Sequence, residues 1–157
     1  MEIINENAEY SANDVLPVVE ECLSMGSDVR IHVSGISMTP LLHNIKDTVV
    51  ISPVSVPRKY DIVLYKRPDG QYVLHRIVGK KKGFFAMAGD FETQKEYPVA
   101  RDMIIGRVVS FCRNGKEYTP DDFVIRLYSI IWVFIMPLRQ YVLWALNAIR
   151  RILHGKR

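Results

Sequence analysis

Six short runs rich in β-branched and aromatic residues follow one another through the middle of the chain. They cover residues 29–33, 48–53, 62–66, 72–78, 83–88 and 104–113. Turn-forming residues border them, as in Pro68-Asp69-Gly70 and Asn114-Gly115, which favour tight hairpins. Because almost no helix separates the runs, the strands cannot be joined by the crossovers that a parallel sheet needs. The sequence therefore predicts a mainly β fold, an antiparallel barrel-like or sandwich body over residues 29–125.

Residues 1–28 are predicted to form an acidic helical segment that packs on this body. The segment has seven acidic residues and no Lys or Arg. One apolar stripe at helical spacing supports the helix, made of Val15, Val18, Val19, Cys22 and Leu23. Asn13 or Asp14 would cap this helix, and Gly26 would end it. The polar, acidic start lacks the basic and apolar regions of a signal peptide, so we expect no such leader.

Residues 126–157 form a basic tail with six Lys or Arg residues and no acid. Its apolar run, residues 127–138, is shorter than the roughly 20 residues that a membrane-spanning helix needs. After Pro137, a helical projection gathers the polar side chains within an arc of about 120°: Arg139, Gln140, Asn147, Arg150, Arg151 and His154. This pattern predicts a basic amphipathic helix that lies on an anionic membrane surface. The alternatives are a helix that packs on the body or on a second copy, and a true membrane span.

Charge and residue counts limit the classes of partner. The formal net charge of +4 comes mostly from the tail, so we expect no nucleic-acid partner. Two cysteines and four scattered histidines show no metal-ligand spacing, and we expect neither a metal nor a cofactor. The predicted location is cytoplasmic, or peripheral on a membrane through the basic tail.

Three short segments carry residue types suited to nucleophilic chemistry. Ser37 lies in a turn that follows a strand, and a serine hydroxyl needs an adjacent base to become a nucleophile. His75 lies within a strand, and imidazole is suited to general-base work near neutral pH. Asp90 follows a glycine at a strand end. Each segment alone is also typical of an ordinary turn or core residue, so the prediction depends on their combination.

Five blocks in one order carry a resemblance to a known family. They read S-G-I-S-M-T-P at 34–40, D-I-V-L-Y at 61–65, H-R-I-V at 75–78, G-D at 89–90 and I-I-G-R-V at 104–108. This order resembles the signal peptidase I and LexA-like serine peptidase superfamily, over about half of the chain. The histidine at the base position makes the chain most similar to the endoplasmic-reticulum and archaeal-like branch, in a short bacterial-looking form.

The resemblance implies a barrel-like peptidase body and hydrolysis of a peptide bond through an acyl-enzyme. Ser37 matches the nucleophile and His75 the general base. Asp90 matches the supporting acid, with Glu96 as the alternative acid. The backbone N–H of Ser37 is the expected oxyanion donor, and the adjoining oxyanion and substrate positions are assigned to Ser34, Gly35 and Met38. An extended substrate would add to a sheet edge near residues 33–36.

The expected partner is a peptide or protein substrate: a leader, a signal or a small precursor peptide. A catalytically silent peptide-binding or assembly module that keeps the fold is the alternative. A self-cleaving LexA-like regulator is the third reading and ranks last. Such a regulator usually carries an N-terminal DNA-binding domain, and the acidic first 28 residues are unsuited to approaching phosphate.

Overall fold

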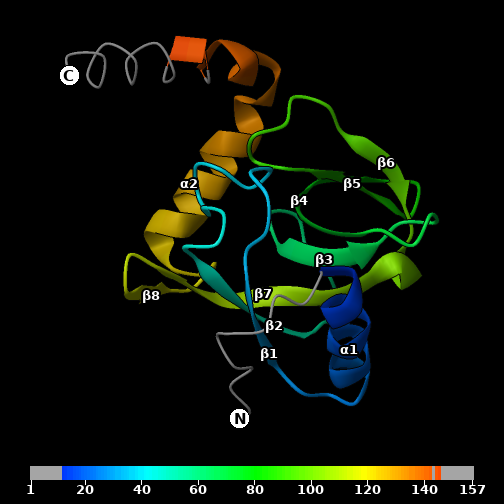
Figure 1. Cartoon of the computed structure of the whole chain (residues 1–157). Helices are drawn as coiled ribbons and strands as arrows, with labels where there is room; N and C mark the ends of the chain where they lie inside the picture. Colours follow the sequence, from blue (N-terminus) through cyan, green and yellow to red (C-terminus); the bar gives the residue numbers. More distant parts are fainter. Residues whose placement is uncertain (1–11, 143, 146–157) are drawn as a thin grey trace.

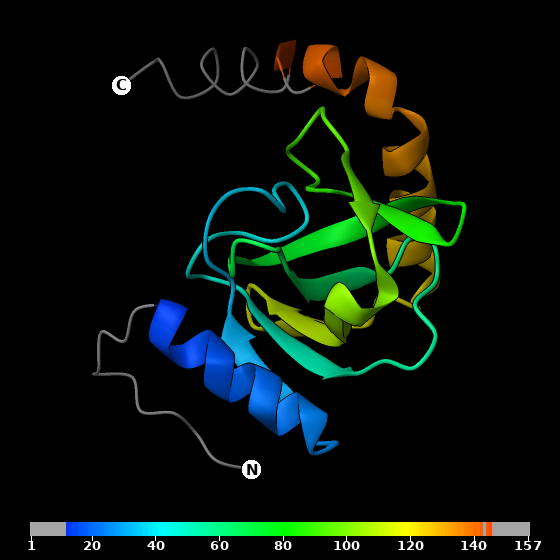
Figure 2. The same ribbon diagram turned by 90° about the vertical axis from the view of Figure 1, so that its right-hand side faces the viewer.

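The structure is a computed structural model that describes residues 12–142, 144 and 145 (Figure 1). Its elements are α1 (Ala12–Ser24), β1 (Val29–His32), β2 (Thr48–Pro53), β3 (Ile62–Lys66), β4 (Tyr72–Lys81), β5 (Phe84–Ala88), β6 (Glu96–Val99), the short 3-10 helix η1 (Arg101–Met103), β7 (Ile104–Arg113), β8 (Lys116–Tyr118), α2 (Phe123–Phe134) and the 3-10 helix η2 (Met136–Leu138). The sheet body lies between the two helices, α1 on one side and α2 on another, as the two views show (Figures 1 and 2).

All strands belong to one antiparallel sheet, so the prediction of a mainly antiparallel β fold is confirmed. The strand order is β1-β2-β7-β3-β4-β5-β6, and β8 pairs with β7. Each of the six predicted runs contains a strand, and the sequence missed β6 and β8. The predicted barrel-like or sandwich body is an open sheet and not a closed barrel, because in the described residues β1 and β6 are edge strands that each pair on one side only. Strand propensity predicts which residues extend, whereas closure depends on how the two edges meet in space.

The central strand β3 separates two hydrophobic cores. Its side chains alternate between the faces of the sheet, with Ile62 and Leu64 in one core and Val63 and Tyr65 in the other. The first core also contains the apolar side of α1 and the turn that follows β1. Because β3 is buried on both faces, its run of apolar residues has no alternation to a polar side.

Helix α1 packs on the body, as predicted, through Val19 and Leu23. The predicted cap is wrong: the helix already includes Asn13 and Asp14, so neither residue precedes its first turn. Its end is confirmed at Gly26, which has a φ of 87° and donates its N–H to the carbonyl of Leu23. Glycine adopts this left-handed conformation without the steric cost that a side chain would bring.

Helix α2 begins at Phe123 and crosses the predicted boundary at residue 126. Ser129 and Trp132 are buried against the body, and Met136 packs with Val78 and Ala88 of the sheet. The described part of the tail therefore packs on the body, one of the predicted alternatives. No helix in the described residues is by itself long and apolar enough to cross a membrane, although α2 and Met136–Val142 meet that criterion as a pair bent by 64°.

The predicted polar arc after Pro137 is wrong at Arg139. This side chain is fully buried, and its guanidinium donates to the backbone carbonyls of Gly89, Glu92 and Trp132 at 2.8, 2.7 and 2.9 Å. Three aligned carbonyl groups replace the water that a helical projection assumes around an arginine. The other charged members of the arc, Arg150 and Arg151, lie outside the described residues, as do Asn147 and His154.

Candidate active site

His75 is positioned by the β3–β4 hairpin. It lies in β4 directly opposite Val63 of β3, and its side chain is almost fully buried. Both ring nitrogens face oxygen atoms: Nδ1 is 3.3 Å from the hydroxyl of Tyr65, and Nε2 is 3.4 Å from Oε1 of Glu92. The tight turn of the hairpin sets this register, which places Tyr65 two residues along from Val63 on the same face of the sheet.

A hydrogen-bond relay on the Nδ1 side of His75 favours the tautomer with its proton on Nδ1. The Tyr65 hydroxyl donates to Oε2 of Glu96 at 2.7 Å, and Arg67 holds the same carboxylate at 2.7 to 3.1 Å. Burial, followed by the neighbouring Glu96, raises the pKa of Tyr65, so the phenol keeps its single proton. Because that proton is directed to Glu96, the phenol oxygen accepts the Nδ1–H of His75. In that tautomer the lone pair of the neutral imidazole is on Nε2, which faces the carboxylate of Glu92 in this arrangement.

The electrostatic environment keeps His75 neutral. Burial lowers the pKa of His75, the carboxylate of Glu92 partly offsets this effect, and Arg67 lowers the pKa further. Burial would raise the pKa of Glu96, but hydrogen bonds from Arg67 and Tyr65 lower it overall. The site therefore combines an uncharged imidazole with an ionised carboxylate one hydroxyl away.

We expect the imidazole of His75 to titrate below pH 6.5 and to carry its neutral proton on Nδ1. Nitrogen-15 NMR of the imidazole rings reports both properties, since the chemical shifts of the two nitrogens separate on tautomer formation. Tyr65→Phe removes the acceptor of Nδ1–H, so this variant is expected to lose the tautomer preference. A neutral His75 protonated mainly on Nε2 at pH 7 would contradict the relay.

Ser37 lies in the turn that follows β1, where the backbone is held on both sides. The carbonyl of Ser37 accepts the N–H of Phe91 at 2.8 Å, and Thr39 N–H bonds the carbonyl of Ile36. Within the described part of the chain, the N–H of Ser37 donates to no acceptor. Gly35, with a φ of 85°, turns the chain and donates its N–H to Asn44. The turn thus presents a half-buried serine and an unoccupied backbone donor in one residue.

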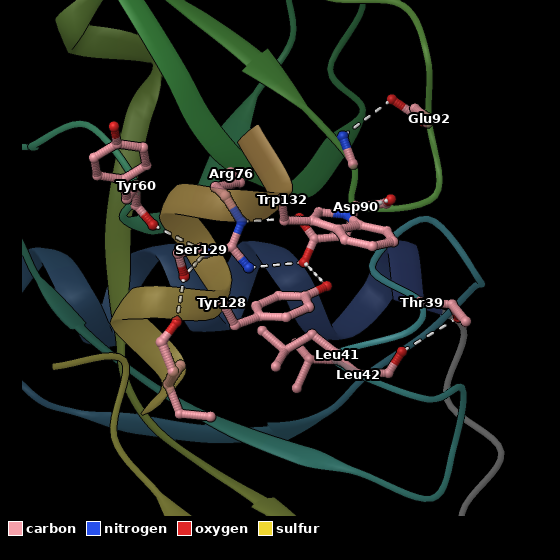
Figure 3. A network of polar contacts seen from close by, with 12 residues as sticks. Thr39, Leu41, Leu42, Tyr60, Arg76, Asp90, Glu92, Tyr128, Ser129 and Trp132 are labelled. Atoms are coloured by element: carbon pink, nitrogen blue, oxygen red, sulfur yellow. Dashed lines mark hydrogen bonds and ion pairs between the residues drawn. The ribbon is translucent and has the colours of Figure 1, made fainter. Parts of the chain in front are cut away.

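Gly89 brings the serine turn and the loop after β5 into contact. A Cβ added at Gly89 would lie 2.5 Å from the carbonyl oxygen and 3.1 Å from Cβ of Ser37, so no side chain fits there. The same position is 3.2 Å from Cδ of Glu92, whose Oε2 accepts the Gly89 N–H (Figure 3). Glu92 is therefore a common neighbour of Ser37 and His75. In the described residues, no hydrogen bond joins Ser37 directly to His75.

The structure separates the two predicted acids. Asp90, the favoured one, is fully buried and contacts Arg76 at 2.7 and 2.8 Å rather than His75 (Figure 3). It also accepts the Tyr128 hydroxyl at 3.2 Å. Glu96, the alternative acid, reaches His75 through Tyr65. Asp90 therefore belongs to a buried ion pair with Arg76, whereas Glu96 is linked to His75 through Tyr65.

The three residues that were assigned to the oxyanion and substrate positions differ in their exposure to solvent. Ser34 and Gly35 are exposed beside Ser37, where a ligand can reach them. The side chain of Met38 is buried in the first hydrophobic core with Leu41 and Leu42, which leaves only its backbone for the predicted oxyanion and substrate role. A methionine after a turn serine has no polar partner to satisfy, and burial of its side chain anchors the turn.

A hollow of about 590 Å³ opens beside this network. Its lining residues are Arg67, Phe91, Glu92, Thr93, Gln94, Lys95 and Glu96. Three of them, Arg67, Glu92 and Glu96, also belong to the network around His75. The hollow carries both signs of charge, and it borders the edge strand β6. Among the described residues, no group of three or more His, Cys, Asp or Glu side chains is arranged to hold a metal ion.

Comparisons with protein-family models, curated proteins and solved structures found no match to this chain. The chemical interpretation therefore depends on the geometry of the site and on the five sequence blocks. Four of those blocks contribute to one region: the serine turn, β3 with Tyr65, β4 with His75, and the loop that begins at Gly89.

Proposed function

We propose that this chain is a serine endopeptidase of signal-peptidase-like type. It would cleave a peptide bond in a leader, signal or small precursor peptide through an acyl-enzyme on Ser37. The observation that carries the proposal is the arrangement around His75: Tyr65 and Glu96 hold its Nδ1 side, and Nε2 faces Glu92 of the loop that contacts the serine turn. Arrangement of a base by a hydrogen-bonded third group is the general signature of an activated serine.

The proposed reaction follows from these positions. Nε2 of His75 takes the proton of Ser37 as Oγ attacks the carbonyl carbon, and the N–H of Ser37 donates to the developing oxyanion. The imidazolium keeps its Nδ1–H on Tyr65, and the nearby Glu96 carboxylate stabilises the positive charge. The imidazolium then protonates the leaving amine. A water molecule, deprotonated by His75, hydrolyses the ester and restores both residues.

Glu92 must leave Nε2 before Ser37 can transfer its proton. The side chain of Glu92 is 43% exposed, whereas that of His75 is 3% exposed, so Glu92 can turn into solvent while the base stays in place.

The predicted substrate edge at residues 33–36 loses Val33, because the N–H of Val33 bonds the carbonyl of Asp47 and its carbonyl accepts the N–H of Ile45. Residues 34–36 remain exposed beside Ser37 and opposite no other strand of the sheet.

Labelling of the full-length chain with a fluorophosphonate tests this function. We expect one adduct, which mass spectrometry of proteolytic peptides places on Ser37. Ser27→Ala is the matched control, since Ser27 is an exposed serine in the turn that follows α1, outside the candidate site, and this variant should keep the label. Loss of folding before labelling should abolish the adduct. Equal labelling of wild type and Ser37→Ala would overturn the proposal.

One observation favours a second candidate function, a catalytically silent peptide-binding module. In the described residues Ser37 has no direct hydrogen bond to His75, and the Glu92 carboxylate faces Nε2 at 3.4 Å. A silent module would bind an extended peptide with the same affinity in wild type and Ser37→Ala. It would give no fluorophosphonate adduct in the folded state, so the same labelling experiment separates the two functions.

A further inference from the structure

Helix α2 has apolar side chains on two opposite faces. Trp132 and the partly buried Ile125 face the body, where the ring of Trp132 stacks on Tyr128 with centroids 5.4 Å apart. On the opposite face, residues at spacings of three and four form a second row, which we name the α2 stripe: Phe123, Leu127, Ile130, Ile131 and Phe134. All five are exposed. A helix with apolar side chains on two opposite faces is typical of one that is covered on both faces.

The exposed apolar surface extends beyond α2. Leu138, Tyr141 and Trp144 follow at intervals of three residues and are also exposed. The two views place α2 on the outside of the molecule, with the sheet on one side of it only (Figures 1 and 2). Contiguous apolar surfaces of this kind mark interaction sites, and tyrosine and tryptophan favour the boundary between lipid headgroups and acyl chains.

Two occupants can cover this apolar surface, a second copy of the chain or a lipid bilayer, and charge distinguishes between them. Residues 126–157 contain six Lys or Arg residues and no acid, and Arg126 lies exposed on α2 itself. A second copy docked on α2 would bring two cationic segments together. An anionic bilayer instead attracts such a segment and covers the apolar side chains. We propose that the α2 stripe docks flat on the surface of an anionic lipid bilayer. This surface differs from the amphipathic helix predicted after Pro137, whose polar arc was expected to include Arg139, a residue that is in fact buried.

The docking helix is connected to the candidate active site through its inner face. Trp132 donates to the backbone carbonyl of Asp90 at 2.8 Å, and Arg139 binds the carbonyls of Gly89 and Glu92. These bonds tie α2 and the segment that follows η2 to the loop that contacts Ser37 and His75. If the proposed peptidase function holds, docking brings the active site to membrane-bound or membrane-emerging peptides. The docking itself does not depend on that function.

Vesicle flotation of the full-length chain tests the docking surface. Wild type is expected to float with phosphatidylcholine vesicles that contain phosphatidylglycerol, and much less with phosphatidylcholine alone. The variant Leu127→Ser/Ile131→Ser/Phe134→Ser should lower the ratio of bound to free protein by about 100-fold or more, since three large apolar side chains no longer leave water. The matched control is Val18→Ser/Met25→Ser/Val56→Ser, at positions 54%, 69% and 68% exposed, which should float like wild type.

Circular dichroism and size-exclusion chromatography with light scattering complete the test. Equal flotation of wild type and the stripe variant would overturn the proposal. So would equal binding to neutral and anionic vesicles, or a wild-type dimer that does not float and that the stripe variant converts to a monomer. Fluorophosphonate labelling in the absence of vesicles should be unchanged in the stripe variant. Loss of flotation with intact labelling therefore concerns docking alone, and loss of labelling in wild type concerns the proposed function alone.

Discussion

Replacement of His75 by glutamine is expected to slow the acylation of Ser37 by about 10²- to 10⁴-fold, the usual contribution of a general base. Glutamine can still fill the buried position and bond the Tyr65 hydroxyl, but it cannot accept the serine proton. The rate constant for fluorophosphonate labelling of the full-length chain measures this loss. In wild type, this rate should rise with pH through an apparent pKa below 6.5, because burial lowers the pKa of His75 and only the neutral base reacts. The variant should lose that dependence.

His32→Gln is the control for this experiment. His32 is an exposed histidine in β1, and its Nδ1 lies 3.0 Å from the carbonyl of Ile45, away from the site network. We expect labelling at the wild-type rate with the wild-type pH profile. Equal rates for His75→Gln, His32→Gln and wild type would remove His75 from the proposed mechanism. Melting temperatures of all three proteins show whether a lost rate reflects a lost fold.

The strands that the sequence predicted are those whose residues have a high intrinsic preference for the extended conformation. Runs such as 62–66 are rich in β-branched and aromatic residues, and the adjoining turn residues fix their ends. The two missed strands are short, and β6 contains Pro98, which a strand prediction penalises. The open edge of the sheet could not be predicted, because local sequence does not determine whether β1 and β6 meet.

In the candidate site, too, the sequence identified residues by their type but not those whose place depends on contacts between distant parts of the chain. Ser37 and His75 were identifiable from residue type and order along the chain. Glu92 was not, since its place depends on the contact between the loop after β5 and the serine turn, more than 50 residues apart. Tyr65 had a detectable signal: with the hairpin turn assigned, the register places it on the same face as the partner of His75. Asp90 matched the expected acid by residue type, yet its carboxylate accepts hydrogen bonds from Arg76, the residue after His75.

Replacement of Arg76 by methionine is expected to lower the free energy of unfolding by about 3–5 kcal/mol, the usual cost of leaving one partner of a buried ion pair uncompensated. Arg76 and Asp90 are each 1% exposed, and the guanidinium meets both carboxylate oxygens. Arg76 also donates to Ser129 of α2 at 2.7 Å, as Figure 3 shows. Chemical denaturation followed by tryptophan fluorescence measures the loss. Because total stabilities are commonly 5–15 kcal/mol, the variant should unfold at a much lower denaturant concentration.

Arg30→Met is the matched control, since its partner Glu117 lies at the same kind of distance but both side chains are at least half exposed. An exposed pair contributes about 1 kcal/mol or less, so this variant should remain close to wild type. The double variant Arg76→Met/Asp90→Leu removes the stranded charge as well and should regain part of the lost stability. A loss of stability in Arg76→Met no larger than that in Arg30→Met would show that the buried pair does not hold α2 to the loop.

If the buried pair does hold α2 to this loop, Arg76→Met should also slow the labelling of Ser37, because the loop that begins at Gly89 contacts both Ser37 and, through Glu92, His75.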